Sequence, residues 1–377
     1  MSFRKVIFWS HLVAGVATSL VIILLAVTGV LLTYEAQITR WAESGFAVSS
    51  GTAPLPADQL AELALAQTGG KASALVFSND PEAALLATSG RDGKLFLDPY
   101  SGVVLGEGAT ATGAFFTKVM FLHRWLSLSG PTEIGGAIIG MSNLVFCFLF
   151  LSGVWLWLPR IWRWGMLKAK ILFRRSYPNA KARDFAWHHI FAFWAAIPLF
   201  LIVLSGVVIS LPSVSNLIYT IHGEEPPAGR GRPGGPAASG PLAIAADGVG
   251  LQYIVDQAAA YEPGWKRITL TLPKGEGADE VRVMVDTGTG RQVAKQQTLT
   301  ISQAGGETVK VSGLGDLSPA TQSRVWWRYI HTGEVYGLFG QTVAGLATLA
   351  SLVMAYTGLA LSYRRLIQPL LRRRRAA

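Results

Sequence analysis

Four long apolar stretches constrain this chain more than any other feature. They are Val6–Thr33, Ile134–Leu158, Phe185–Leu211 and Tyr336–Tyr363. Each exceeds the roughly 20 residues that about 30 Å of hydrocarbon requires at about 1.5 Å per residue. Only 15% of the 377 residues are charged, which is low for a soluble protein of this size. The sequence therefore predicts an α-helical membrane protein with four spans.

The first stretch differs from a cleaved signal peptide in its length and in the residues that follow it. Its apolar run is far longer than a signal peptide's apolar core, and no small-x-small cleavage site follows it before "TYEAQITRW". We therefore expect it to be retained as a membrane anchor.

Basic residues are distributed unequally among the segments that join the spans. Residues 160–184 carry eight basic residues against one acidic residue, and the tail after Leu361 carries six arginines. Residues 34–117 carry nine acidic residues against four basic ones. By the positive-inside rule, both termini and residues 160–184 are expected in the cytoplasm, and residues 34–117 and 212–330 outside it. The net charge of +10 is thus a topology signal, and no nucleic-acid partner is expected.

The cysteine content and the glycine patterns exclude several classes of protein. The single cysteine, Cys147, lies inside a predicted span, so the chain has no internal disulfide, no thiolate metal site and no covalent haem attachment. No G-x-G-x-x-G pattern follows a strand and there is no Walker loop, so no nucleotide-binding domain is expected. The segment "GRGRPGGPAASG" at 229–240 has the composition of a flexible linker.

The two outer segments resemble each other, which indicates an internal repeat. Each offers a helical pattern ("LPADQLAELALAQTG" and "GLQYIVDQAAAYEPG") followed by strand patterns, such as "GKLFLDPYSGVVLGE" and "EVRVMVDTGTGRQVAKQQ". Each also has an Asp-x-x-x-Gly turn, at Asp98–Gly102 and Asp286–Gly290. The sequence therefore predicts two repeats of span, α+β module and span.

Hydroxyl–glycine pairs repeat near the ends of the spans. The pairs are Thr28-Gly29, Ser152-Gly153, Ser205-Gly206 and Thr357-Gly358. Gly29 follows His11 by eighteen residues, and Gly206 follows His188 by eighteen residues. His189 is out of this register, so His188 is the expected equivalent of His11.

Four of the six histidines fall at the ends of the predicted spans. His11 and His188 are expected at the cytoplasmic side, and His123 and His331 at the outer side. Two imidazoles that face each other across a bundle suit an octahedral iron, as in bis-histidine haem, whereas zinc would need further ligands. The alternative is that each imidazole donates to a neighbouring helix or lies at the headgroup level.

Small residues near these histidines favour a flat cofactor. Gly15 lies four residues after His11, on the same helix face, and Ala192 has that place after His188. His189 has the bulky Phe193 there. Eighteen residues make about 27 Å of helix, so Gly29 and Gly206 are expected level with the outer histidines. The alternative is that these glycines only allow close helix packing.

Arginines near the outer histidines are candidate partners for haem propionates. Arg124 adjoins His123, and Arg328 precedes His331 by three residues. Lys5 and Arg183 have the corresponding place near the inner pair. A contact with lipid headgroups is the alternative.

In the order of its motifs, the chain resembles the PepSY-associated transmembrane family. The motifs are "HLVAG" and "VTG", "FLHRWL", "WHHIFAFW" and "LSG", "IHTGEVYG", and "LDPYSG" in the outer module. The resemblance implies His11 and His188 on one haem b and His123 and His331 on a second. His189 stays an alternative, because family members often have His-Arg at "HH" and a glycine at Ala192.

The resemblance also implies a location and an activity. Members include inner-membrane ferrisiderophore reductases, so we expect a multi-pass protein of the bacterial inner membrane with PepSY-like periplasmic modules, in contact with lipid. It would reduce a ferric siderophore with electrons from a separate donor, a quinol or a cytoplasmic reductase. Alternatives are a binding or regulatory protein built on the modules, and an iron-chelate permease, against which stand the few spans and the expected absence of a broken helix.

These expectations divide the chain into eight segments. They are span one (1–33), outer module one (34–117), a histidine-bearing entry segment with span two (118–159), the basic loop (160–184), span three (185–211), the linker with outer module two (212–330), span four (331–363) and the basic tail (364–377).

Overall fold

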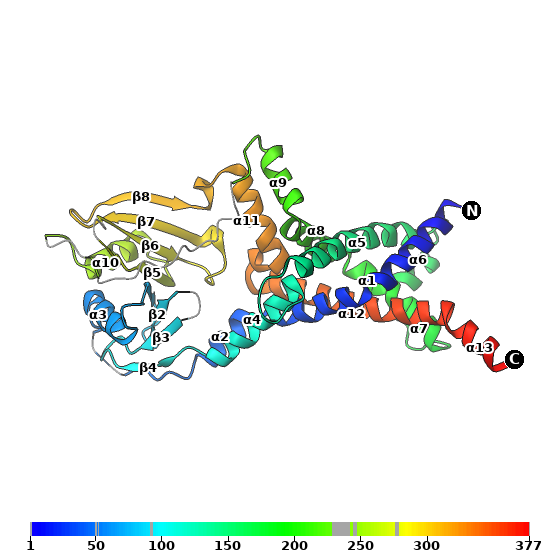
Figure 1. Ribbon diagram of the computed structural model, residues 1–377, viewed down its shortest axis with the longest axis horizontal. Helices are drawn as coiled ribbons and strands as arrows, with labels where there is room; N and C mark the ends of the chain where they lie inside the picture. The colour runs from blue at the N-terminus through cyan, green and yellow to red at the C-terminus, as the bar shows by residue number, and fades with distance from the viewer. Residues whose placement is uncertain are drawn as a thin grey trace. The chain divides into compact units, whose positions relative to one another are not determined.

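The structure is a computed structural model, and it describes residues 2–49, 51, 53–90, 93–227, 242–243, 247–275 and 279–376. The linker predicted at 229–240 lies outside the described residues. The chain divides into two compact units, which are described separately (Figure 1). A helical unit comprises Met1–Glu35, Phe115–Gly223 and Ser323–Ala377, and a sheet unit comprises Ala36–Ala114 and Glu224–Gln322.

The helical unit is built around five helices that pack in a ring. Its elements are α1 (Phe3–Thr33), α4 (Thr110–Trp125), α5 (Glu133–Trp157), α6 (Trp164–Ile171), α7 (Ala180–Trp194), α8 (Ala196–Ser210), α9 (Pro212–Ile221), α11 (Pro319–Thr332), η3 (Glu334–Tyr336), α12 (Gly337–Leu366) and α13 (Gln368–Ala376), of which α4 and α11 begin in the sheet unit. Helix α1 packs against α5 and α12, α12 packs against α7 and α8, and α5 packs against α8.

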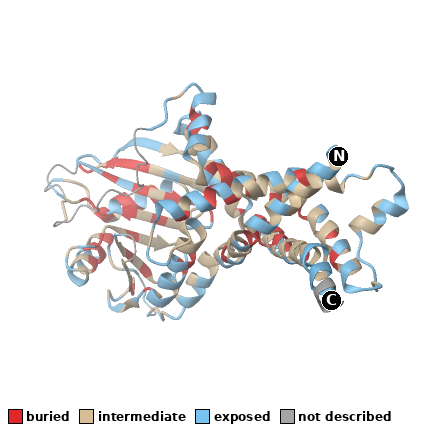
Figure 2. Cartoon of the chain, turned by 45° about the vertical axis from the view of Figure 1, so that its right-hand side comes forward, coloured by how far each residue is buried: buried red, intermediate tan, exposed pale blue. Residues whose placement is uncertain are grey.

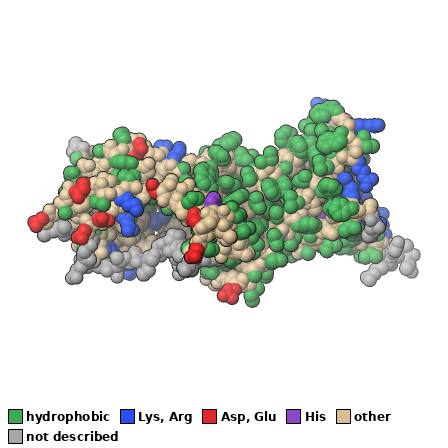
Figure 3. All heavy atoms as spheres, turned by 90° about the horizontal axis from the view of Figure 1, so that it is seen from above, with side chains coloured by type: hydrophobic (Ala, Val, Ile, Leu, Met, Phe, Trp, Pro, Cys, Tyr) green, Lys and Arg blue, Asp and Glu red, His purple; other side chains and the backbone are tan. Residues whose placement is uncertain are grey.

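The surface of the helical unit is apolar along its long helices. Leu20 is 79% exposed, Ile197 77% and Leu346 62%, although water would disfavour so many exposed aliphatic side chains. Figure 3 shows hydrophobic side chains over this unit, with Lys and Arg gathered at its end. Three described helices are long and apolar enough to cross a membrane, or four if α7 and α8 form one span. The unit therefore belongs to a membrane protein.

The third apolar stretch is broken, which corrects the expectation that the chain has no broken helix. Helices α7 and α8 meet at Ala195 with a bend of 74°. Pro198 has no N–H to donate, and its ring clashes with the carbonyl of Trp194 four residues earlier, so the helical ladder is interrupted there. The first span has no proline, and α1 continues unbroken for 31 residues.

The two outer histidines lie on short helices of their own, each ahead of a long one. His123 is on α4, which ends at Trp125 and is followed by a turn with Leu126 at φ 50°. His331 is on α11, which ends at Thr332, and Gly333 has φ +74°. Both chain reversals use the left-handed region of backbone space, which glycine adopts without strain.

The sheet unit holds one continuous sheet made by both outer segments. Its elements are α2 (Glu35–Ala42), which begins at the last residue of the helical unit, α3 (Ala57–Gln67), β1 (Ala74–Ser78), β2 (Leu85–Ser89), β3 (Gly93–Leu97), β4 (Val104–Glu107), α10 (Leu251–Tyr261), β5 (Arg267–Thr271), β6 (Glu280–Asp286), η1 (Val293–Lys295), β7 (Gln296–Ser302), β8 (Thr308–Gly313) and η2 (Leu314–Asp316). The order is β4-β3-β2-β1-β5-β6-β7-β8, with every neighbouring pair antiparallel.

The central pair of this sheet joins the two sequence repeats. Strands β1 and β5 pair with Leu75 opposite Leu270, and each is the first strand of its own segment. The sequence predicted one module in each outer segment, and the structure joins the strands of both segments edge to edge. Each strand thereby avoids an exposed edge at the junction, which would otherwise favour aggregation.

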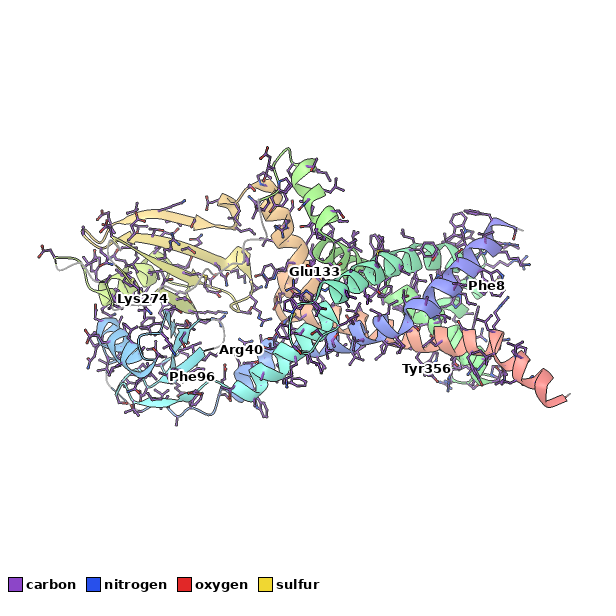
Figure 4. All side chains as sticks on the ribbon, viewed as in Figure 1. Phe8, Arg40, Phe96, Glu133, Lys274 and Tyr356 are labelled. Carbon is purple, nitrogen blue, oxygen red and sulfur yellow. The ribbon has the colours of Figure 1, made fainter. Side chains whose placement is uncertain are left out.

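One face of the sheet is covered by α3 and α10, at the places where the sequence predicted helices. Leu60 and Leu251, from these two helices, are buried with alternate strand residues such as Leu75 and Leu270 in a single core (Figure 2). On another strand, Phe96 (labelled in Figure 4) stacks on Phe46 with ring centroids 4.6 Å apart. The period-two patterns of the strands are thus explained by this core.

The repeated Asp-x-x-x-Gly turns have the conformation that the sequence predicted. Asp98 accepts a hydrogen bond from the Tyr100 N–H at 2.9 Å, and Gly102 has φ +72°. Asp286 accepts from the Gly288 N–H at 2.6 Å, and Gly290 has φ +91°. Burial of Asp98 opposes its ionisation and would raise its pKa. Hydrogen bonds from Ser49 and Tyr100 outweigh this effect and hold the pKa of Asp98 at about 2.

Candidate functional site

Four histidines of the helical unit share one hydrogen-bonding arrangement. In the first half of the chain, His11 Nδ1 lies 2.8 Å from the Ser152 hydroxyl, and His123 Nδ1 lies 2.8 Å from the Thr28 hydroxyl. Each imidazole therefore reaches from one helix to a hydroxyl on another helix of the same half. Both hydroxyls belong to the hydroxyl–glycine pairs of the sequence.

The second half repeats the arrangement. His188 Nδ1 lies 3.0 Å from the Thr357 hydroxyl, and His331 Nδ1 lies 3.1 Å from the Ser205 hydroxyl. The histidine of the first span in each half thus contacts the second span, and the entry histidine contacts the first span. This match survives the bend between α7 and α8. We call Thr28, Ser152, Ser205 and Thr357 the hydroxyl set.

The hydroxyls of the hydroxyl set also bond to their own helices. A Ser or Thr hydroxyl has one proton, and in every member of the hydroxyl set it is donated to the carbonyl four residues earlier. These bonds are Thr28 to Leu24 (2.6 Å), Ser152 to Phe148 (2.7 Å), Ser205 to Leu201 (2.6 Å) and Thr357 to Val353 (2.8 Å). The hydroxyl oxygen is thus left to face Nδ1 of the ring as an acceptor.

The glycine beside each hydroxyl faces the same imidazole. A Cβ at Gly29 would lie 3.5 Å from Cε1 of His123, and one at Gly206 would lie 3.4 Å from Cε1 of His331. Gly153 stands in this relation to His11 at 3.4 Å, and Gly358 to His188 at 3.5 Å. Each glycine therefore faces the edge of the imidazole ring, and a Cβ there would be in direct contact with the ring.

Gly15 lies one helical turn beyond His11 and faces the Leu149 side chain. A Cβ there would meet only the Leu149 side chain within 4 Å, at an ordinary contact distance of 3.7 Å. Packing between the described helices therefore does not require a glycine at this position.

Two of the four imidazoles, one from each half, lie close together. The ring centroids of His123 and His331 are 6.3 Å apart at an interplanar angle of 56°. Two metal–nitrogen bonds of about 2 Å, with the distance from each nitrogen to its ring centre, place two imidazole centroids about 6 Å apart. The described residues contain no cluster of three or more His, Cys, Asp or Glu side chains that would hold a metal without a cofactor.

A comparison with known families agrees with the order of these elements. The model of the PepSY-associated TM region matches residues 8–365, which is nearly the whole chain. The chain belongs to this family. No curated protein matches it. Family membership makes the protein a multi-pass membrane protein, in agreement with its long apolar helices.

Within this PepSY-associated protein, His188 and its neighbour have different surroundings. His189 Nδ1 bonds to the Phe185 carbonyl of its own helix at 2.8 Å, and its ring packs on Phe185 with centroids 4.3 Å apart. His188 reaches across to α12, as His11 reaches across to α5. Phe193, one turn beyond His189, stacks on Trp157 at 5.3 Å and 16°, so the space there is filled by aromatic rings.

The arginines that the sequence associated with propionates lie at the surface. Arg124 is exposed, with its guanidinium 4.4 Å from the centre of the Trp125 ring. Arg328 is exposed on α11, one helical turn before His331, over the Tyr329 ring.

Near His11 and His188, the two basic residues that the sequence associated with propionates have different surroundings. Lys5 is exposed, whereas Arg183 forms an ion pair with Asp184 at 2.9 Å and lies over the Trp187 ring. His222, which the sequence placed in an outer loop, is exposed and lies 3.0 Å from the Ser323 hydroxyl.

The sequence reasoning missed a buried ion pair beside His188. Asp184 is fully buried and bonds to Arg364 at 2.5 Å as well as to Arg183. It lies one helical turn before His188, and the pair ties α7 to α12 next to the His188–Thr357 bond. The signal was available, because an acidic residue four positions before a histidine at the start of a span lies on the same helix face.

Proposed function

We propose that this protein is a di-haem b-type electron-transfer protein of the bacterial inner membrane, which reduces a ferric siderophore in the periplasm and releases Fe(II). The observation that carries the proposal is that four buried or half-buried imidazoles each place Nδ1 on a hydroxyl of a neighbouring helix, and that His123 and His331, one from each half, have ring centroids 6.3 Å apart. Two bulky axial ligands per iron, and no third protein ligand, are what bis-histidine haem requires. This constellation is more specific than the alternative of scattered structural histidines.

Each of the two cofactors would be held by one pair of histidines. His11 and His188 would be the axial ligands of one haem b, and His123 and His331 those of the other. Gly15 would leave room for the first macrocycle, and Gly29 and Gly206 lie against the imidazoles of the outer pair. When bound, haem iron supplies reversible one-electron redox chemistry at each position. No thioether can form, because Cys147 is the only cysteine in the sequence.

The chain's own residues also fit a direction for the transfer. With the basic ends of the helices in the cytoplasm, His11 and His188 would lie on the donor side, and His123 and His331 on the periplasmic side. A quinol or a cytoplasmic reductase would give one electron at a time, and each electron would convert one ferric chelate to Fe(II) and the free siderophore. Ferric iron holds hard oxygen ligands more tightly than ferrous iron does, so reduction favours release.

The bend at Ala195 is the observation that bears on a permease. Broken helices in transporters present polar groups to a substrate at mid-membrane. Here the residues around the break, "FWAAIPL", are apolar, and Pro198 accounts for the bend. The bend therefore gives the permease no polar site, and electron transfer stays the function that the geometry favours.

The test is the haem content of the purified protein. We expect two non-covalent haems per chain, extractable by acid–acetone, with a reducible b-type absorption spectrum in the membrane fraction. Dithionite-reduced protein should be reoxidised by a ferric siderophore, and Fe(II) should then be trapped by a ferrous chelator. A stoichiometry of one haem, or of none after expression with ample haem, would contradict the proposal.

A further inference from the structure

We propose that the hydroxyl set consists of positioning residues that fix the Nδ1–H tautomer of the four histidines, and that His11 alone depends on its hydroxyl for this. The statement about the tautomer rests only on the hydrogen bonds of the helical unit. Its consequence for the haems rests on the proposed function. Neither the hydroxyls nor the tautomers follow from the choice of iron ligands.

The donors available around each imidazole decide which tautomer fits its hydroxyl. A buried hydroxyl that donates to its own helix can only accept from the ring, and a protonated Nδ1 is the only donor that the neutral ring can place there. Which nitrogen of a histidine is free to bind a metal is set by the hydrogen bond that the other nitrogen makes. By accepting from Nδ1, the four hydroxyls would leave the Nε2 lone pair of each of the four histidines free.

The second step is that three of the histidines have another acceptor besides the hydroxyl. The Met354 carbonyl lies 3.1 Å from His188 Nδ1, and the Ile202 carbonyl lies 3.0 Å from His331 Nδ1. The Leu25 carbonyl acts on His123 in the same way. Each of these carbonyls belongs to the residue three positions before the hydroxyl, so a helix supplies both acceptors together.

The third step is the exception. The carbonyl in the corresponding place for His11 is that of Leu149, and among the described contacts it receives the Ser152 hydroxyl at 3.3 Å and no bond from the ring. Loss of the Ser152 hydroxyl would leave an Nδ1–H without an acceptor in an apolar bundle, which is costly. The ring would then move its proton to Nε2, where it blocks metal binding.

The matched variants change the hydroxyls that contact His11 and His188, the two histidines proposed to share one iron. Ser152→Ala removes the one acceptor that the described residues place at His11 Nδ1, whereas Thr357→Ala removes a hydroxyl from His188 but leaves the Met354 carbonyl. Ser152→Thr keeps a hydroxyl at the same place and is the conservative control. A second-sphere acceptor typically changes metal affinity by about 10–100-fold, so we expect a loss in that range for Ser152→Ala and a smaller loss for Thr357→Ala.

The first experiment is nitrogen NMR of the full chain without haem, labelled at histidine. We expect Nδ1–H signals from His11, His123, His188 and His331 in the unchanged protein. Ser152→Ala should move His11 alone to the Nε2–H form, and Thr357→Ala should move none. An Nε2–H form of His11 in the unchanged protein, or an unaltered His11 in Ser152→Ala, would overturn the inference.

The second experiment is a redox titration of the haem-loaded protein, followed by electron paramagnetic resonance. A donated Nδ1–H bond adds electron density to the ligand and stabilises the ferric state, so Ser152→Ala should raise the potential of one haem and alter its low-spin signal. Thr357→Ala should shift it less, and Ser152→Thr should restore it. Equal shifts from both alanine variants, or loss of haem from Ser152→Thr as well, would contradict the inference.

The two experiments separate this inference from the proposed function. Protein that binds no haem but shows the four Nδ1–H tautomers would contradict the function and leave the tautomer assignment standing. Protein that holds two haems, with a Ser152→Ala potential equal to that of the unchanged protein, would contradict the inference and leave the function standing.

Discussion

The two halves of the helical unit differ in how many hydrogen-bond acceptors they place at the histidine of their first span. In the first half, α1 is unbroken, and His11 has the Ser152 hydroxyl as its acceptor. In the second half the span is bent by 74°, yet His188 has a hydroxyl and a carbonyl acceptor and lies beside a buried ion pair. The comparison teaches that the histidine–hydroxyl–glycine unit tolerates large changes in the helix that carries it. What it requires is a local contact between two helices of one half.

A second lesson is that the halves are built separately but would act together. Each histidine bonds to a hydroxyl of its own half, whereas the close pair His123–His331 takes one ring from each half. The sheet unit shows the same logic, since β1 and β5 bring the two outer segments together edge to edge. A duplicated half-site that is completed by its copy explains why the repeat is so regular around the histidines.

The largest expected effect breaks the comparison at an iron ligand. His188→Ala should hold one haem instead of two, and His11→Ala should give the same result, because in the proposed arrangement the two rings share one iron. His189→Ala should keep both haems, since its Nδ1 bonds to its own helix and adjacent helical residues point about 100° apart. Haem per chain, measured as the pyridine haemochrome, checks this. One haem in His189→Ala with two in His188→Ala would reverse the assignment.

The next effect tests the buried ion pair at Asp184, which lies in the second half. Asp184→Asn should destabilise the helical unit toward the lower end of the about 3–5 kcal/mol seen when a buried pair loses one partner, because Arg183 and Arg364 keep partial access to solvent. Thermal unfolding in detergent measures it. Asp80→Asn, at an exposed turn, is the control and should be neutral. Equal melting temperatures for both variants would remove Asp184 from the structural account.

A smaller effect is expected at the Asp98 turn of the sheet unit. The pKa of Asp98 is about 2, below the ordinary value of about 3.9, so its ionised form stabilises the fold above pH about 4, and that stability is lost as the pH falls toward 2. Asp98→Asn should lower stability at pH 7 and flatten its dependence between pH 4 and 2. Hydrogen exchange of the sheet amides in the full chain reports this. An unchanged pH dependence would contradict the assignment.

The spans and the candidate ligands could largely be predicted from sequence because their signals are local. Apolar length marks a span wherever it occurs, and the eighteen-residue spacing gave His188 the place that His11 has. The structure gives these two rings the same kind of hydroxyl partner. The Asp98 and Asp286 turns were likewise predictable, because side chain, turn and glycine lie within five residues.

The remaining features depend on contacts between distant segments or on one residue's steric effect. Nothing in strand β1 shows that it pairs with β5, some 190 residues later, rather than forming the edge of its own module. The role of the hydroxyls required the distance from each ring to another helix. The bend was overlooked because hydropathy does not register Pro198, whereas the missing N–H of a proline does interrupt a helix.

The smallest effect concerns the charges next to the outer pair, where the halves differ in the position of an arginine. Arg124 adjoins His123, and Arg328 precedes His331 by one turn; both are exposed. A positive charge favours the reduced centre, so Arg124→Gln should lower the potential of the outer haem slightly, and Arg328→Gln should do the same. Solvent and salt screen exposed charges, so the shift should shrink as the ionic strength rises, and Arg124→Lys should show none. Redox titration at low and high salt measures both shifts. A potential unaltered by Arg124→Gln at low salt would leave this side chain a contact for lipid headgroups, whereas a shift of the same size in Arg124→Lys would point to lost packing on Trp125 instead of lost charge.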